Sequence, residues 1–390
     1  MPNKYLLLIS IIISIGFYQN IHLTWYGNAP DRISALGYQA EIHKITTQDG
    51  YILEAHRIPQ TKKNRPVVLL VHGVFSSSDT FLLNGVENAL GFQASNEGYD
   101  VWLLNLRGNR YSNHHVNLST ISMEFWAFTF HEMAVYDLPA TIDYIMKVTG
   151  QQNIHYIGHS QATNIYFALL SEKPEYNKFL KTGHLLASGL SQEDSVIDRV
   201  YLGNITLPFI NFFDYGSFGM HFYFAPLNYV LWVISQTPAI GAVFSKAIGI
   251  FGGSSITLNM TILPDILATM PTGSSARNVI HLSQGCRNFR QFDFGLEEEN
   301  IKRYGSKVPR FYDFGNIDVP TYIHNGGQDN IVSLACVNSI SKKLRKGVLK
   351  KVIIHDEFSH IDFVASVESK KRINDFIFEV IQNYEMGGKL

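Results

Sequence analysis

The sequence of 390 residues contains little charge and very little cysteine. Asp, Glu, Lys and Arg make up 17% of the chain, below the roughly 25% of an average soluble domain, and the formal net charge is −1. No polycationic surface is expected, so a nucleic-acid partner is unlikely on composition. The two cysteines, Cys286 and Cys336, exclude a disulfide framework and a cysteine-rich metal site. Whether they form one bridge or remain two thiols is left open.

Long uninterrupted apolar runs are also missing from the region that follows the first twenty residues. No stretch reaches the 18 apolar residues typical of a transmembrane helix, so the mature chain is predicted to have no membrane span. Apolar residues nevertheless make up 46% of the chain and aromatic residues 13%, which excludes wholesale disorder. The chain also has 15 histidines, and charging all of them would move the formal net charge to +14. We therefore expect acid pH to change the surface strongly.

The N-terminus has the features of a secretory signal peptide. Lys4 precedes an apolar run over residues 6–17, and the small residues Ser14 and Gly16 suit a cut after Gly16, so residues 1–16 are predicted to be removed. An uncleaved signal anchor is the alternative. Three sequons, which begin at Asn117, Asn204 and Asn259, are candidate glycosylation sites and fit passage through the secretory pathway.

Apolar runs and turn residues alternate along the chain in the manner of an α/β protein. Two alternating segments, residues 41–47 and 51–58, flank Asp49-Gly50 and predict a hairpin. Continuous apolar runs predict strands buried on both faces of a parallel sheet. These predicted strands are residues 67–71, 101–104 and 154–157, and residues 321–324 and 351–355 are predicted to be late strands. Helical patterns lie between them, at residues 85–96, 132–148, 162–170 and 362–383. The order predicts a doubly wound, mostly parallel sheet with helices on both faces.

The alternation of strand and helix patterns is lost over residues 188–305. Residues 209–232 hold ten aromatic side chains in 24 positions, and Pro226 and two glycines interrupt the run. We interpret residues 188–305 as an inserted helical cap or lid, and residues 17–187 with 306–390 as the core. An ordinary helical subdomain that buries its own aromatics is an equally good interpretation of the composition.

A candidate nucleophile follows the strand at residues 154–157. Gly158-His159-Ser160-Gln161-Ala162 lies between that strand and a helix, which is the context of a nucleophile elbow. The turn would lift the Ser160 hydroxyl clear of the sheet. It would also place the Gln161 backbone N–H at the positive end of a helix, where it can stabilise an oxyanion.

A second oxyanion donor is expected in the loop after the strand at residues 67–71. There His72-Gly73-Val74 offers the backbone N–H of Val74. Taken alone, His72-Gly73 would be a plain turn.

The acid and the base of a serine triad should follow the nucleophile in the order Ser, Asp, His. Asp329 follows the strand at residues 321–324 through a Gly-Gly turn, at the carboxyl end where α/β sheets gather their sites. Asp318 precedes that strand, at the wrong end. His360 follows the last strand by a short loop, whereas His355 lies within the strand itself. Ser160, Asp329 and His360 are therefore the predicted triad.

From about residue 37 to the C-terminus the chain resembles the acid lipases, the gastric and lysosomal type of α/β-hydrolase. The resemblance is carried by long stretches of sequence. They are residues 47–53 (TQDGYIL), 72–74 (HGV), 98–103 (GYDVWL), 107–112 (RGNRYS), 132–140 (EMAVYDLPA), 158–161 (GHSQ), 325–329 (NGGQD) and 360–363 (HIDF). Val74 and Ala162 stand where the family usually has Leu and Gly, and residues 330–333 differ from the usual run.

The resemblance implies an α/β-hydrolase fold and hydrolysis of triacylglycerols and sterol esters at acid pH, in secretions or lysosomes. It implies no metal and no added cofactor, and a cap with a lid over an acyl-binding cleft. The expected partners are neutral lipid esters at a droplet or emulsion interface. A carboxylesterase for smaller soluble esters, and a lipid-binding protein that kept the fold without turnover, are the alternatives.

Overall fold

The computed structural model describes residues 27–62, 64–189, 219–220, 225–285 and 289–388. The predicted signal peptide, the Asn204 sequon and most of the aromatic run at residues 209–232 lie outside the described residues. So does Cys286, whereas Cys336 is disulfide-bonded, which decides between bridge and thiol for that cysteine.

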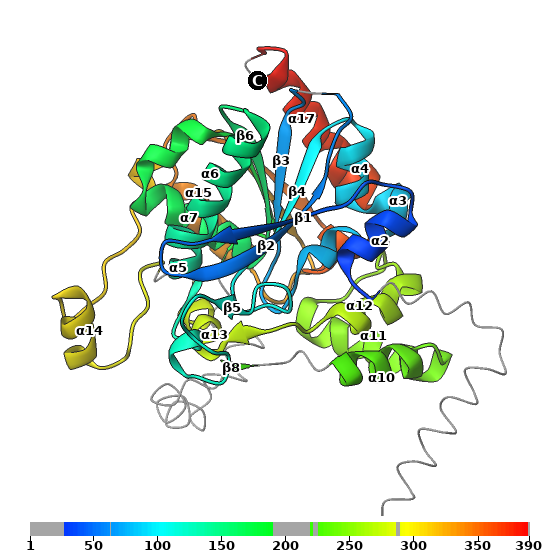
Figure 1. Ribbon diagram of the computed structural model, residues 1–390, viewed down its shortest axis with the longest axis horizontal. Helices are drawn as coiled ribbons and strands as arrows, with labels where there is room; N and C mark the ends of the chain where they lie inside the picture. Colours follow the sequence, from blue (N-terminus) through cyan, green and yellow to red (C-terminus); the bar gives the residue numbers. More distant parts are fainter. Residues whose placement is uncertain (1–26, 63, 190–218, 221–224, 286–288, 389–390) are drawn as a thin grey trace, which may run out of the picture.

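A central sheet organises the molecule, with strand order β1-β2-β4-β3-β6-β7-β10-β11 and with β5 paired to β2 (Figure 1). Its strands are β1 (Glu41–Thr46), β2 (Tyr51–Ile58), β3 (Val67–Val71), β4 (Asp100–Asn105), β5 (His114–His115), β6 (Ile154–His159), β7 (Leu180–Leu186), β10 (Thr321–Gly326) and β11 (Leu349–His355). β1, β2 and β5 pair antiparallel, and every pairing from β4 to β11 is parallel. The mostly parallel sheet is as predicted.

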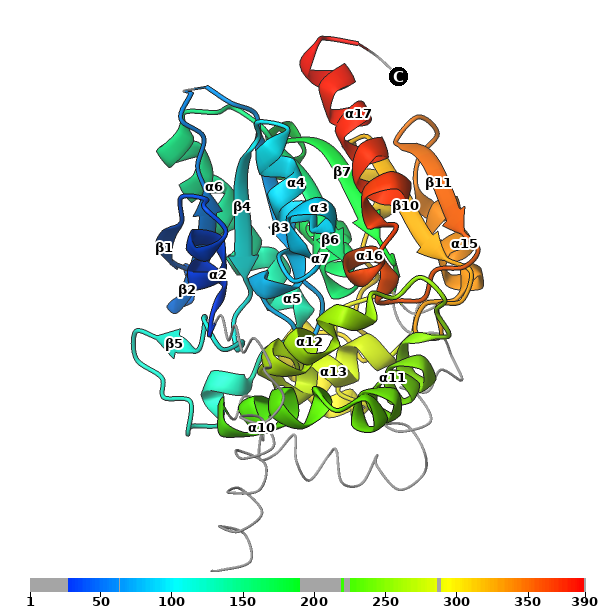
Figure 2. The same ribbon diagram turned by 90° about the vertical axis from the view of Figure 1, so that its right-hand side faces the viewer.

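Helices cover both faces of the sheet because its central strands are apolar on both sides. In β3, Val67, Leu69 and Val71 pack into one core, while Val68 and Leu70 pack into the other. The first core is covered by α5 (Phe130–Glu132), α6 (Leu138–Thr149), α7 (Gln161–Glu172) and α15 (Leu334–Lys343). The second is covered by α2 (Ala29–Ala35), α4 (Leu90–Asn96), α16 (Asp362–Ala365) and α17 (Asp375–Glu385) (Figure 2).

Several predicted helices are interrupted. Residues 85–96 form α3 (Gly85–Asn88) and α4, because Ala89 between them is extended. Residues 132–148 begin as α5 and pass through a π-helical turn, Met133–Asp137, before α6. The predicted C-terminal helix breaks at Ser366, where the chain is extended and forms a bridge with Leu258. A long-range pairing therefore outcompetes the local helical pattern.

Residues 225–283 lie beyond the carboxyl ends of the parallel strands (Figure 2). They form α10 (Ala225–Ser235), α11 (Pro238–Gly252), α12 (Leu263–Thr269), β9 (Ser274–Ser275) and α13 (Ala276–Ser283), with β9 paired to β8 (Gly219–Met220). A small apolar cluster, in which Ile262 and Ile266 meet Leu83 and Ala365, joins this segment to the core. The exact boundaries of the cap at residues 188 and 305 stay a prediction.

Within the described residues, a membrane crossing could be built by length and composition from only one pair of helices. The pair, Asn228–Ser235 and Ala239–Gly252, is bent by 117°, and no single helix there is both long and apolar enough.

Candidate active site

Ser160 stands on a strained turn between β6 and α7. Its backbone adopts φ 56° and ψ −120°, a conformation that non-glycine residues rarely hold. The turn is tight enough to require glycine two residues earlier, since a Cβ on Gly158 would lie 2.8 Å from the Tyr156 ring and 3.1 Å from the Ala162 methyl. The methyl of Ala162 is fully buried and occupies space that Gly158 leaves free. The elbow therefore accommodates alanine in the place where the family usually has glycine.

The structure brings the three predicted triad side chains together. His360 Nε2 lies 2.8 Å from Ser160 Oγ, and His360 Nδ1 lies 2.8 Å from Asp329 Oδ2. The second oxygen of Asp329 accepts the backbone N–H groups of Ile331 and Val332, each at 2.8 Å. These donors hold the carboxylate, which is 0% exposed, beside the imidazole. The aspartate thereby favours the tautomer with Nδ1–H, which leaves Nε2 to accept from the serine hydroxyl.

Asp318, the other aspartate considered beside β10, lies elsewhere and forms an ion pair with Arg345. His355, also set aside, lies in β11 and stacks on His324.

The backbone of His360 is held on two sides. His159, which precedes the nucleophile, donates from Nε2 to the His360 carbonyl at 3.0 Å. Burial lowers the pKa of His159 to about 3, so the ring is neutral and keeps a single N–H for this bond. On the other side, the His360 N–H donates to the carbonyl of Gly252, at the end of α11, at 2.9 Å.

The loop after β3 is organised by His72. Its Nε2 accepts the Leu106 N–H at 3.1 Å, so Nδ1 carries the proton and donates to the Gly73 carbonyl at 2.7 Å. Burial lowers the pKa of His72 to about 4, which keeps the ring neutral. A Cβ on Gly73 would lie 3.0 Å from the Ser160 Cβ, so this loop approaches the nucleophile closely. In the described part of the chain, the Val74 N–H has no intramolecular acceptor.

The relatives of this chain were found at the level of both sequence and fold. Residues 29–85 match the family model "Partial alpha/beta-hydrolase lipase region", and residues 66–212 match the model "alpha/beta hydrolase fold". Human gastric triacylglycerol lipase is 34% identical over 366 residues, which span 91% of this chain and 90% of that protein. Macaca fascicularis lysosomal acid lipase/cholesteryl ester hydrolase is 32% identical and covers 92% of this chain and 91% of its own length. The chain belongs to the acid lipase family.

Solved structures agree with the α/β-hydrolase fold of this acid lipase family member. A protein from Sulfolobus solfataricus superposes with a TM-score of 0.59 at 16% identity, over 88% of this chain and 94% of the other. An epoxide hydrolase from Vigna radiata gives a TM-score of 0.51 at 15% identity, over 88% and 98%. At these identities the likeness concerns the fold alone.

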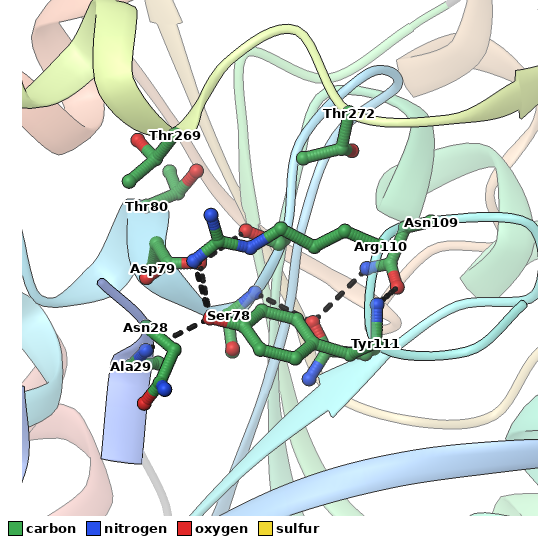
Figure 3. A network of polar contacts seen from close by, with 12 residues as sticks. Asn28, Ala29, Ser78, Asp79, Thr80, Asn109, Arg110, Tyr111, Thr269 and Thr272 are labelled. Carbon is green, nitrogen blue, oxygen red and sulfur yellow. Dashed lines mark hydrogen bonds and ion pairs between the residues drawn. The ribbon is translucent and has the colours of Figure 1, made fainter. Parts of the chain in front are cut away.

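In this acid lipase family member, an arginine–aspartate network supports the loop after β3 (Figure 3). Arg110 and Tyr111 both donate to Asp79 Oδ2, at 2.8 and 3.0 Å, and the Tyr111 hydroxyl accepts the Ala29 N–H of α2. The side chain of Asp79 is 2% exposed and that of Arg110 is 3% exposed. Residues Arg110 and Tyr111 of the family-specific run at residues 107–112 therefore stabilise the loop that follows β3 and carries Val74.

Asp362 was not predicted as a site residue, although it lies in the family-specific run that begins at His360. One carboxylate oxygen accepts the N–H and the hydroxyl of Ser359, both at 2.6 Å. The other accepts the hydroxyls of Ser255 and Thr257, at 2.6 and 2.9 Å. Asp362 thus ties the loop of the candidate base to residues 255–257. Its position two residues after His360 was the only available signal.

The candidate glycosylation sites differ in their surroundings. Asn117 is exposed. The Nδ2 atom of Asn259, to which a glycan would be attached, instead donates to Asn84 at 2.9 Å. Glycosylation of Asn259 stays a prediction, because a glycosylated Nδ2 would keep one N–H for this contact.

Proposed function

We propose that the chain is a lipase that hydrolyses carboxylic esters of neutral lipids, triacylglycerols and sterol esters, through an acyl-enzyme on Ser160. The observation that carries the proposal is the chain of two 2.8 Å contacts that links Asp329, His360 and Ser160. His360 removes the Ser160 proton as the hydroxyl attacks the ester carbonyl. His360 then donates this proton to the departing alcohol, and a water molecule repeats the cycle on the acyl-enzyme.

The backbone N–H groups of Val74 and Gln161 stabilise the oxyanion that develops on the ester carbonyl. Gln161 is the first residue of α7, so its N–H has no acceptor within the helix and carries part of the positive end of the helix dipole. Since Val74 contributes only its backbone, the change from the family's usual leucine leaves this role intact.

The substrate class is proposed from the family and from apolar surface near the site. Four large side chains close to or within α11 are more than half exposed: Val243, Ile250, Phe251 and Ile256. Between residues 225 and 256 the only charged side chain is Lys246. Such a surface favours contact with a lipid droplet or emulsion over free solution.

We also propose a secretory destination, extracellular or lysosomal, and keep the cleaved residues 1–16 and glycosylation at Asn117, Asn204 and Asn259 as predictions. The disulfide at Cys336 supports this, because disulfides persist in oxidising compartments.

A substrate panel tests the proposal. Purified protein is assayed on triolein, a cholesteryl ester, tributyrin and a soluble p-nitrophenyl ester, at pH 5 and pH 7.5, beside Ser160→Ala. Turnover of triolein or the sterol ester that is absent in Ser160→Ala is the expected result. Activity on the soluble ester alone would favour the carboxylesterase alternative. An absence of turnover, together with no fluorophosphonate adduct on Ser160, would favour a non-catalytic lipid-binding protein.

A further inference from the structure

We propose that Thr272 and Asn278 are positioning residues that hold the two oxyanion donors at their working separation. Both lie in the segment beyond the carboxyl edge of the sheet, outside the hydrolase core. The inference rests on the proposed function, because it concerns the same oxyanion site, and it adds a role that the triad and the backbone donors do not require.

Thr272 holds the loop immediately after Val74. Its backbone N–H donates to the Phe75 carbonyl at 2.8 Å, and its hydroxyl donates to the Ser76 carbonyl at 2.7 Å. Phe75 itself has a φ of 58°, so the chain turns sharply next to the donor and needs external support to stay there. Thr272 is fully buried, which removes water as a competitor for both carbonyls.

The same loop is fixed from its opposite side by the core. Asn109 Nδ2 lies 3.1 Å from His72 Nε2 and 3.4 Å from the Ser76 carbonyl oxygen, and Arg110 pairs with Asp79 further along the chain. Figure 3 shows Thr272 on the segment that crosses over Arg110, with Asn109 and Tyr111 beneath. The loop therefore has hydrogen bonds to the core on the one hand and to Thr272 on the other.

Asn278 holds the other donor. Its Nδ2 donates to the side-chain oxygen of Gln161 at 2.6 Å, and the Gln161 amide nitrogen lies 3.2 Å from the sulfur of Met133. Asn278 is fully buried, and its own N–H donates to the hydroxyl of Ser275. The side chain of Gln161 is thus fixed at both ends, which restrains the first turn of α7 beside its free backbone N–H.

A single short stretch, residues 272–278, therefore holds the two residues that follow Val74 and the side chain of Gln161. Because Thr272 and Asn278 are joined by a few residues and are buried at both ends, the stretch sets the spacing of the two donors. A displacement of about 1 Å in such a group can cost up to roughly 100-fold in rate. Substrate binding does not need this spacing, so the cost should fall on kcat.

Thr272→Val tests the inference, with Thr272→Ser as the matched control. Valine keeps the shape and the backbone N–H but removes the hydroxyl, whereas serine retains the hydroxyl. On a soluble p-nitrophenyl ester, we expect Thr272→Val to lower kcat by about 10- to 100-fold with KM within about twofold. Thr272→Ser should stay within about threefold of the parent protein. The inhibition constant of an alkylboronic acid, whose tetrahedral adduct places an oxygen in the hole, should rise in parallel with the loss of kcat.

Asn278→Ala is the second variant and covers the case in which Thr272→Val does not fold. It should show the same pattern, a lower kcat and weaker boronate inhibition at unchanged KM. If folded variants keep kcat and boronate affinity and lose only thermal stability, the two residues are merely structural and the inference is wrong. Parent protein that hydrolyses no ester at all would instead overturn the proposed function, so the two failures are distinguishable.

Discussion

The backbone of Ser160 stores strain that should be visible as stability. At φ 56° and ψ −120°, a residue with a Cβ costs on the order of 1–3 kcal/mol, whereas glycine tolerates this region. Ser160→Ala removes the hydroxyl and its contact with His360 but keeps the Cβ and the strain. Ser160→Gly removes the contact and the strain together. Glycine also lowers stability by roughly 0.5–1 kcal/mol through the entropy of the unfolded chain. We therefore expect Ser160→Gly to be more stable than Ser160→Ala by about 0.5–2 kcal/mol.

The assay is a comparison of urea unfolding or thermal midpoints for the two inactive variants under one buffer and one heating rate. Both lack the Ser160 hydroxyl, so the lost hydrogen bond cancels in the difference. In a chain of this length the thermal midpoint should rise by a few degrees at most. A glycine variant that is equal to or less stable than the alanine variant would refute the argument that the nucleophile turn is strained.

Three further outcomes are expected. Asp329→Asn should leave the fold intact and lower kcat by roughly 10³- to 10⁴-fold, because the amide favours the wrong imidazole tautomer. The loss of kcat is measured as ester turnover. Gly253→Ala should lower both activity and thermal midpoint, because a Cβ there would lie 1.7 Å from the carbonyl oxygen of Gln328, the residue before Asp329. A variant with unchanged kcat and unchanged thermal midpoint would contradict this prediction. His184→Phe should raise the thermal midpoint, and by more at pH 5 than at pH 8. The same change at the exposed His114 should leave the thermal midpoint unchanged at both pH values.

The His184 prediction follows from the direction of the histidine pKa values. Burial lowers the pKa of His184 to about 3, from 6.5 in an unfolded chain. The free energy of unfolding therefore decreases as the pH falls below 6.5 toward the folded-state pKa of His184, about 3. At pH 5 this amounts to about 2 kcal/mol for His184. No partner was found for either ring nitrogen of His184 in the part of the chain that the structure describes, so phenylalanine sacrifices no hydrogen bond there.

The neighbours of His184 reinforce this effect. Burial and the adjacent His355 lower the pKa of His324, and burial lowers that of His355 to about 4. Lys351 also lowers the pKa of His324 and Arg372 that of His355, whereas Asp356 raises the pKa of His355. A positive charge on His155 would lower the pKa of His184 further, although burial lowers the pKa of His155 as well. A thermal midpoint that does not depend on pH between 5 and 8 would contradict this account.

The expectation of a strongly charged surface at acid pH does not hold for seven of the 15 histidines, which are buried and have lowered pKa values. They are His72, His155, His159, His184, His281, His324 and His355. Composition counts titratable groups but does not show their solvation. A histidine within an apolar strand, such as His324, titrates far from its ordinary range because the sheet excludes water.

The parts of the site that the sequence could predict are those marked by local chemistry. A buried strand followed by Gly-x-Ser predicts an elbow, and a Gly-Gly turn before Asp329 places that carboxylate at the carboxyl edge of the sheet. β7 was not predicted, because Gly183 and His184 interrupt its apolar run. Gly183 is needed for packing, since a Cβ there would lie 2.5 Å from the Tyr166 hydroxyl. That contact joins residues distant in sequence, so no local pattern could reveal it.

The hydrogen bonds that hold the site from beyond the sheet could not be predicted from the sequence either, because most of them involve backbone carbonyls. Gly252 offers its carbonyl to the His360 N–H, and Thr272 contacts the carbonyls of Phe75 and Ser76. Any residue type presents a carbonyl, so the sequence carries no mark of these bonds. They also limit how the segment beyond the sheet could move. A movement that carried Gly252 away would remove the hydrogen bond to the His360 backbone, and one that carried Thr272 away would remove the bonds that hold the loop after Val74. A movement that preserves the geometry of the candidate site must therefore leave Gly252 and Thr272 in place.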